Sequence, residues 1–188
     1  MVIVPAASFS LVIEFERHSP DPGRVFRAAE GLISLFQEID RDLAGSIDSK
    51  IEPVMMLEDV EAGSLRIWLA QLVNSIDDEA LKKLDWKPAV GIFLVKAKYK
   101  LVEWMNRSGE VKEYKDLAAL SGELRQLAEQ TDVRQIPTYA PVSVPRVARH
   151  IERLSEAKGV LGKGDKLIYS TADGDVPFDM AVITGSGK

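Results

Sequence analysis

Hydrophobic and polar residues alternate near the start of the chain, between residues 8 and 17. In the segment SFSLVIEFER, apolar side chains occupy every second position, at Phe9, Leu11, Ile13 and Phe15. Period two is the side-chain repeat of a β-strand, so this pattern predicts a strand with one apolar face. The polar and proline-containing segment HSPDPG then ends it.

From Pro22 to Ala44 the apolar positions follow helical spacing instead. They are Val25, Ala29, Leu32, Phe36, Ile39 and Leu43. Steps of three and four place these side chains on one side of a helix, which predicts a long amphipathic helix. Pro22 suits the first turn, and Asp21 before it is a candidate N-cap.

Two interpretations are open for the apolar segment that follows Gly63. The segment IEPVMMLEDV, residues 51–60, has strand character, and Glu61-Ala62-Gly63-Ser64 resembles a short hairpin loop. The next segment, SLRIWLAQLV, either pairs back as the second strand or begins a helix capped by Ser64. We favour the hairpin.

The segment AVGIFLVKAKYKLVEWM, residues 89–105, is ambiguous in the same way. Its apolar residues form a helical stripe, yet lysines at 96, 98 and 100 alternate with apolar residues as they would in a strand. The length of the segment and Pro88 before it favour a buried helix. Upstream, residues 77–87 predict a shorter helix with Asp77 as its cap.

The last third of the chain predicts two more helices and a hairpin. Leucines with the spacing of a narrow helical seam stand at Leu117, Leu120, Leu124 and Leu127. Such a seam packs against one neighbouring helix, in the same chain or in another copy. A helix over residues 145–158 follows a proline-rich connector, and residues 166–184 predict a hairpin around Asp173-Gly174.

This order of elements predicts an α+β fold. We expect a mixed or antiparallel sheet with long helices on one face, in a ferredoxin-like β-α-β-β core with helical additions and a C-terminal hairpin. We place an α+β core at residues 1–107 and a helical extension with the hairpin at residues 108–188. The alternative is one continuous domain.

Composition narrows the range of functions. The 188 residues are 46% hydrophobic and 28% charged, contain no cysteine and carry a net charge of -5. A net negative charge argues against nucleic acid as a partner, and the lack of cysteine excludes thiol catalysis and zinc–thiolate sites. We find no apolar stretch of membrane-spanning length, no signal peptide and no cofactor motif, and we expect a cytoplasmic protein.

Acidic residues on the first two predicted strands are the only candidates for a metal site. Glu14 and Glu16 share one face of the first strand, and Glu58 and Asp59 end the second. If these strands were neighbours, the carboxylates would converge on a divalent ion. The alternative is a solvated, charge-protected sheet edge, which we favour, so no metal is expected.

The predicted helix over residues 145–158 carries the sharpest basic stripe. Arg146, Arg149 and Arg153 share one face, with His150 beside them. Guanidinium groups in this arrangement bind phosphate or an acidic partner, while a solvated outer face explains them equally well.

Two stretches also carry a family resemblance. LEDVEAGSLRIWL, residues 57–69, contains the element LED-x-E-x-GS, and LDWKPAVGIFLVKAKY, residues 84–99, contains LDWKP-x-VG-x-x-LVKAKY. Over residues 1–105 the chain resembles a family of bacterial proteins with both elements, of which the second is the more specific. The resemblance implies a bacterial, intracellular protein and carries over no activity and no catalytic residue.

Three functions follow from these observations. The first is a non-enzymatic interaction or regulatory module of a bacterial intracellular assembly, with a protein partner or a second copy bound through the leucine seam. The second is a metal-dependent enzyme that cleaves phosphodiesters with the four acids. The third is a sensor that binds a phosphorylated small ligand through the arginines. Because no catalytic constellation is recognised, we favour the first.

Overall fold

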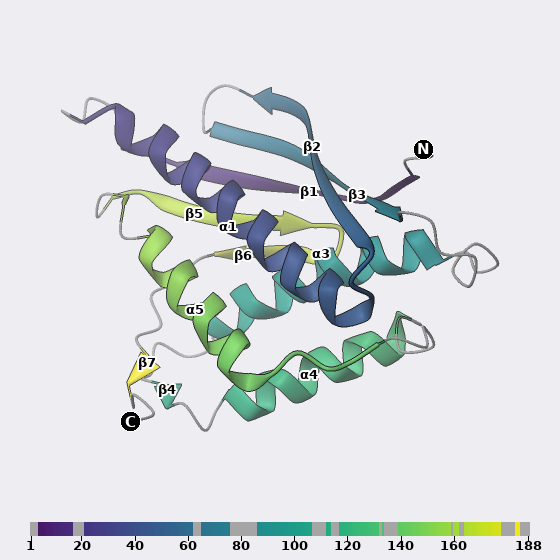
Figure 1. Cartoon of the computed structure of the whole chain (residues 1–188). Coiled ribbons are helices and arrows are strands. Elements are labelled where there is room, and N and C mark those ends of the chain that lie inside the picture. Colours follow the sequence, from purple (N-terminus) through teal and green to yellow (C-terminus); the bar gives the residue numbers. More distant parts are fainter. Residues whose placement is uncertain are drawn as a thin grey trace.

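The structure is a computed structural model. It describes residues 4–16, 21–61, 65–75, 86–106, 112–113, 117–131, 133, 139–158, 160–161, 164–177 and 183–184. Its elements, shown in Figure 1, are β1 (Val4–Glu14), α1 (Gly23–Ile47), β2 (Ile51–Glu61), β3 (Leu65–Ser75), α3 (Trp86–Asn106), β4 (Lys112–Glu113), α4 (Leu117–Gln130), α5 (Val144–Lys158), β5 (Lys166–Thr171), β6 (Gly174–Pro177) and β7 (Ile183–Thr184).

The main sheet has five antiparallel strands in the order β2-β3-β1-β5-β6. Strand β3 lies between β1 and β2, so α1 crosses over one intervening strand. This split β-α-β arrangement, with β5 on the other side of β1, is the predicted ferredoxin-like core. The predicted α+β class is therefore confirmed, including the C-terminal hairpin of β5 and β6.

Both ambiguous segments adopt the favoured conformation. Strands β2 and β3 pair from Ile51↔Ser75 to Glu61↔Arg66, which confirms the hairpin; its turn at 62–64 lies outside the described residues. The lysine-rich segment is helical throughout α3. Most of the helix predicted over residues 77–87 also lies outside the described residues.

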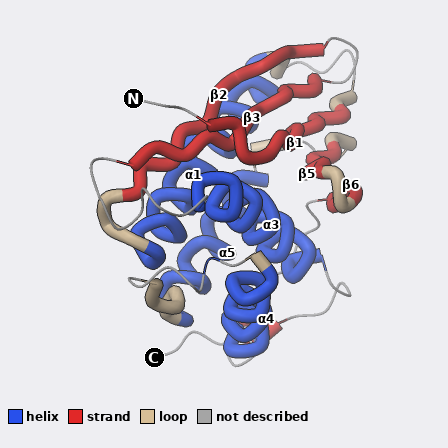
Figure 2. Tube along the Cα trace, turned by 90° about the vertical axis from the view of Figure 1, so that its right-hand side faces the viewer, coloured by secondary structure: helices blue, strands red, loops and turns tan. Residues whose placement is uncertain are grey.

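The helices gather on one side of the sheet, as Figure 2 shows. On that side, Phe9 of β1 packs against Phe36 of α1 at 6.3 Å and against Tyr169 of β5 at 5.3 Å between ring centroids. The hydroxyl of Tyr169 donates a 2.9 Å hydrogen bond to the carbonyl of Val95 in α3. Helices α1 and α3 therefore cover the same face of the central strands.

The leucine seam of α4 packs against other helices of the same chain. Its four members, Leu117, Leu120, Leu124 and Leu127, are all buried. Helix α4 packs against α3 and α5, which supply the neighbouring helical surfaces. The leucine spacing allows packing against a helix of the same chain or of a second copy, and the structure contains the first of these.

One hydrophobic core spans both halves of the chain. It contains Ile13 and Leu32 from the first half, and Ile151 and Leu167 from the second. Strands β5 and β6 belong to the same sheet as β1. Among the described residues, no helix is long and apolar enough to cross a membrane.

A buried arginine joins the start of α1 to Asp165, the residue before β5. Arg24 donates to both carboxylate oxygens of Asp165, at 2.7 and 3.0 Å, and Nη2 also donates to the carbonyl of Glu16. The hydrogen bond to Asp165 raises the pKa of Arg24. The predicted cap at Asp21 is wrong: Pro22 occupies the N-cap position, and the Asp21 carboxylate instead pairs with Arg27 at 2.6 Å.

Candidate functional site

The four acidic candidates do not converge. Strands β1 and β2 are separated by β3, so the condition for a shared metal site is not met. Glu14 lies opposite Lys166 of β5, on the side of β1 away from β2. Glu58 and Asp59 are exposed on the outer strand. Within the described ranges, no three histidine, aspartate or glutamate side chains lie close enough together to hold a metal ion.

The basic stripe of α5 faces acids of α1. Arg149 lies 3.4 Å from Asp42, and Arg153 pairs with Glu38. Arg146 is exposed at the start of α5. Two of the three arginines thus have a carboxylate partner in their own chain, and binding of an external anion by the stripe stays a prediction.

His150 is not on the surface with the arginines but is buried between α5 and α1. Its Nε2 lies 3.0 Å from the Asp42 carboxylate without the alignment of a hydrogen bond. Burial lowers the pKa of His150; Asp42 opposes this shift, and Arg149 reinforces it. The site therefore favours a neutral imidazole.

The most unusual charged pair lies in the core between α1 and α3. Lys98 is 0% exposed and Asp40 is 1% exposed, and the Lys98 Nζ lies 2.5 Å from Asp40 Oδ1. The same ammonium lies 5.2 Å from the centroid of the Phe9 ring. Burial lowers the pKa of Lys98, and the charge of Asp40 opposes that shift.

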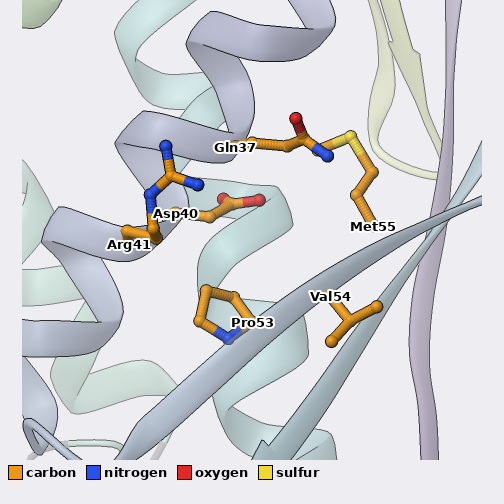
Figure 3. A pocket seen from close by; sticks show the side chains of 6 residues that line it. All are labelled: Gln37, Asp40, Arg41, Pro53, Val54 and Met55. Atoms are coloured by element: carbon orange, nitrogen blue, oxygen red, sulfur yellow. The ribbon is translucent and has the colours of Figure 1, made fainter.

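A small pocket of about 180 Å³ opens between α1 and β2 and reaches this pair. Gln37, Asp40 and Arg41 line it from α1, and Pro53, Val54 and Met55 line it from β2. Figure 3 shows Gln37 pointing across the pocket toward Met55. Because the Asp40 carboxylate is almost fully buried and bonded to Lys98, the pocket offers a ligand little of that charge.

The second half of β2 is exposed along its whole length. Positions 56–61 are all exposed, and three of them are large apolar residues: Met56 is 47%, Leu57 60% and Val60 52% exposed. Among the described strands, β2 stands at the border of the sheet, with β3 as its one neighbour. Figure 2 shows it along the upper border, away from α4 and α5.

A bulge sets the directions of these side chains. The register shifts between Leu57 and Asp59, so Leu57 pairs with Leu69 and Val60 with Ile67. Leu69 and Ile67 belong to the core, which places Leu57 and Val60 on the helix side of β2. Without the bulge, residues three apart would face opposite sides. Met56 and Asp59 face the other side, because their partners in β3 are Ala70 and Trp68.

Edge strands of natural proteins are normally short, charged or covered, since an open edge can pair with another chain. Strand β2 has 11 residues and exposes apolar side chains on both faces. Pro53 and the acids after Leu57 are the protective features present. We take residues 56–61, named here the β2 edge, as the candidate functional site.

Sequence patterns did not identify the Asp40–Lys98 pair or the β2 edge. The pair had a usable signal: Lys98 lies between Leu94 and Val102 at i−4 and i+4, so it falls on the apolar face of its helix. The edge position of β2 has no such signal, because strand order is a tertiary property.

Comparisons of the chain with protein-family models, with curated proteins and with solved structures gave no match. The function is therefore inferred from the structure's own surfaces and charges.

Proposed function

We propose that this protein is a non-enzymatic interaction module that binds a protein partner at the β2 edge. The partner contributes an extended segment that pairs with the outer side of β2 and continues the sheet. Strand addition of this kind draws affinity from main-chain hydrogen bonds and specificity from alternating side chains.

The observation that carries the proposal is the run of six exposed residues at the sheet border, with Leu57 and Val60 on the face where strands normally contact the core. Exposed clusters of large apolar residues mark interaction sites more often than single exposed residues do. Helix α1 lines a pocket with β2 around Pro53 to Met55, before the exposed run begins.

The β2 edge replaces the leucine seam as the contact surface. Leu117, Leu120, Leu124 and Leu127 are at most 5% exposed, so a partner could reach them only after α4 had left α3 and α5. Exposed strand residues require no such opening.

Site-specific photo-crosslinking in the source cells tests the proposal. We expect a photo-reactive amino acid in place of Leu57 to give a discrete crosslinked protein, and the same amino acid in place of Val160 to give none. Val160 is the matched control because it is an exposed aliphatic residue, 42% accessible, outside the sheet. Equal products from both positions, or no product from position 57, would rule out the β2 edge.

A charge placed on the edge provides an independent check. Val60→Lys should abolish capture of the crosslinked partner, since it introduces a charge on the helix side of the strand. Val160→Lys should leave capture unchanged. Circular dichroism of both variants establishes that the fold is retained.

A further inference from the structure

We infer that the segment bound at the β2 edge is an extended peptide in which apolar and basic residues alternate. This inference rests on the proposed function and defines the chemistry of the partner. It follows from the charge of β2 and from the directions that the bulge gives to its side chains.

All the charged residues of β2 are acidic. Residues 51–61 contain four acids, Glu52, Glu58, Asp59 and Glu61, and no lysine, arginine or histidine. Glu61 lies opposite Arg66 of β3 in the register, whereas Glu58 and Asp59 stand in the exposed middle of the edge. An approaching strand therefore meets negative charge at the centre of the surface.

This charge argues against a second copy as the occupant. If two β2 edges paired antiparallel, the acids at 58, 59 and 61 of one copy would come next to the acids of the other. Like charges opposite one another destabilise a strand pair, whereas opposite charges stabilise it. Lysine or arginine side chains are the complementary groups.

The two faces of the β2 edge are complementary to different residues of a bound segment. On the helix side, Leu57 and Val60 offer apolar contacts, and on the opposite side Asp59 follows Met56. Side chains of an added strand also alternate between these two sides. A segment with apolar residues at one set of alternate positions and basic residues at the other matches both sides at once. Six paired residues span roughly 20 Å at the rise of a strand.

Synthetic peptides test this inference. The probe is a nine-residue peptide that alternates valine and lysine. A second peptide replaces every lysine with threonine, a third replaces every lysine with glutamate, and a fourth keeps the composition of the probe but groups the lysines at one end. Binding is measured by fluorescence anisotropy, and its location by hydrogen–deuterium exchange of the amides of residues 56–61.

We expect the valine–lysine peptide to bind most tightly, to lose affinity as salt is raised, and to slow exchange at residues 56–61. The double variant Glu58→Gln/Asp59→Asn, measured below the concentration at which it self-associates, should weaken binding roughly 2- to 30-fold, the range for two exposed charge pairs across strands. The matched control is Glu152→Gln/Glu156→Gln, which removes two exposed acids from α5 and should leave the affinity unchanged.

The possible failures are distinguishable. If the threonine, glutamate or grouped-lysine peptide binds as tightly as the probe, the alternating basic partner is wrong while a partner site at the β2 edge stands. The same holds if no peptide protects residues 56–61 but position 57 still crosslinks a protein, or if the crosslinked protein is a second copy of this chain. If position 57 crosslinks nothing in cells, the proposed function itself fails.

Discussion

At the scale of single residues, the pair formed by Lys98 and Asp40 is a costly feature of the core. Taking two charges out of water is unfavourable, and a short contact between them recovers only part of that loss. Beside them, burial raises the pKa of Tyr169 well above its ordinary value, so its hydroxyl remains a donor to Val95. The core therefore contains a polar centre formed by Lys98, Asp40 and Tyr169.

Removing one member of the pair should be more harmful than removing both. Lys98→Met leaves the Asp40 carboxylate buried next to apolar side chains, and the free energy of unfolding should fall by about 3–5 kcal/mol. The double variant Lys98→Met/Asp40→Asn should lose markedly less than the sum of the two single variants. Urea unfolding of all four proteins measures this coupling, and strict additivity would show that the two residues do not interact.

His150 should make the stability depend on pH. Because burial lowers its pKa in the folded state, the unfolded chain binds a proton first as the pH falls. Stability is then complete above the unfolded pKa of about 6.5 and decreases below it, by up to about 1.4 kcal/mol per pH unit. Urea unfolding between pH 5 and 8 measures the slope.

The chain has two histidines, so the contribution of His150 can be isolated. In a His18→Gln background, the remaining histidine is His150, and His150→Gln should reduce the slope between pH 5 and 7. An unchanged slope would assign the pH dependence to carboxylates instead.

Sequence patterns identify these residues incompletely. Helical spacing shows that Lys98 occupies a core position, but not that Asp40, 58 residues earlier, faces it. Arg24 and Asp165 are 141 residues apart and pair only because β1 and β5 are neighbours. The spacing of the arginines on α5 predicts their common face, while their α1 partners depend on how the two helices dock.

At the scale of elements, the periodicity of hydrophobic residues predicts helices and strands well. Long runs with a consistent repeat, as in α1, correctly predicted both the type and the buried face of the element. The bulge in β2 was beyond prediction, because it follows from pairing with β3 and not from any local turn residue. Since the bulge decides where Leu57 and Val60 point, the candidate site depended on information that only the paired strands contain.

Two glycines offer a direct comparison at this scale. Gly174 in the β5–β6 hairpin has a φ of 131°, which L-residues rarely adopt, so Gly174→Ala should destabilise the protein by about 1–3 kcal/mol. Gly122 lies inside α4, and beyond its chain neighbours and the nearby backbone of its own helix no atom lies within 4 Å of an added Cβ. Gly122→Ala should therefore stabilise the protein by about 0.5–1 kcal/mol. Thermal unfolding of both variants measures the effects, and the same sign for both would contradict the backbone explanation.

At the scale of the whole molecule, the acids of β2 keep the exposed β2 edge from associating with other copies of the protein. Glu58→Gln/Asp59→Asn keeps the size of both side chains and removes their charge, leaving Met56, Leu57 and Val60 exposed. We expect this variant to self-associate at concentrations where the unchanged protein does not, since repulsion between two edges is lost.

Light scattering over a concentration series measures this association. Glu152→Gln/Glu156→Gln changes the net charge equally but not at the edge, and should show no concentration dependence. If both double variants associated alike, overall charge and not the β2 edge would control solubility.

The position of β1 in the sheet affects how the protein folds during translation. Its partner on one side, β3, ends at residue 75, but its partner on the other side, β5, begins only at residue 166. During translation, about half of the chain must therefore be synthesised after β3 before β5 can pair with β1. Contacts of such long sequence separation slow folding and leave an unfinished sheet open to chaperones. The protein should reach its native state only after the ribosome has released residue 171.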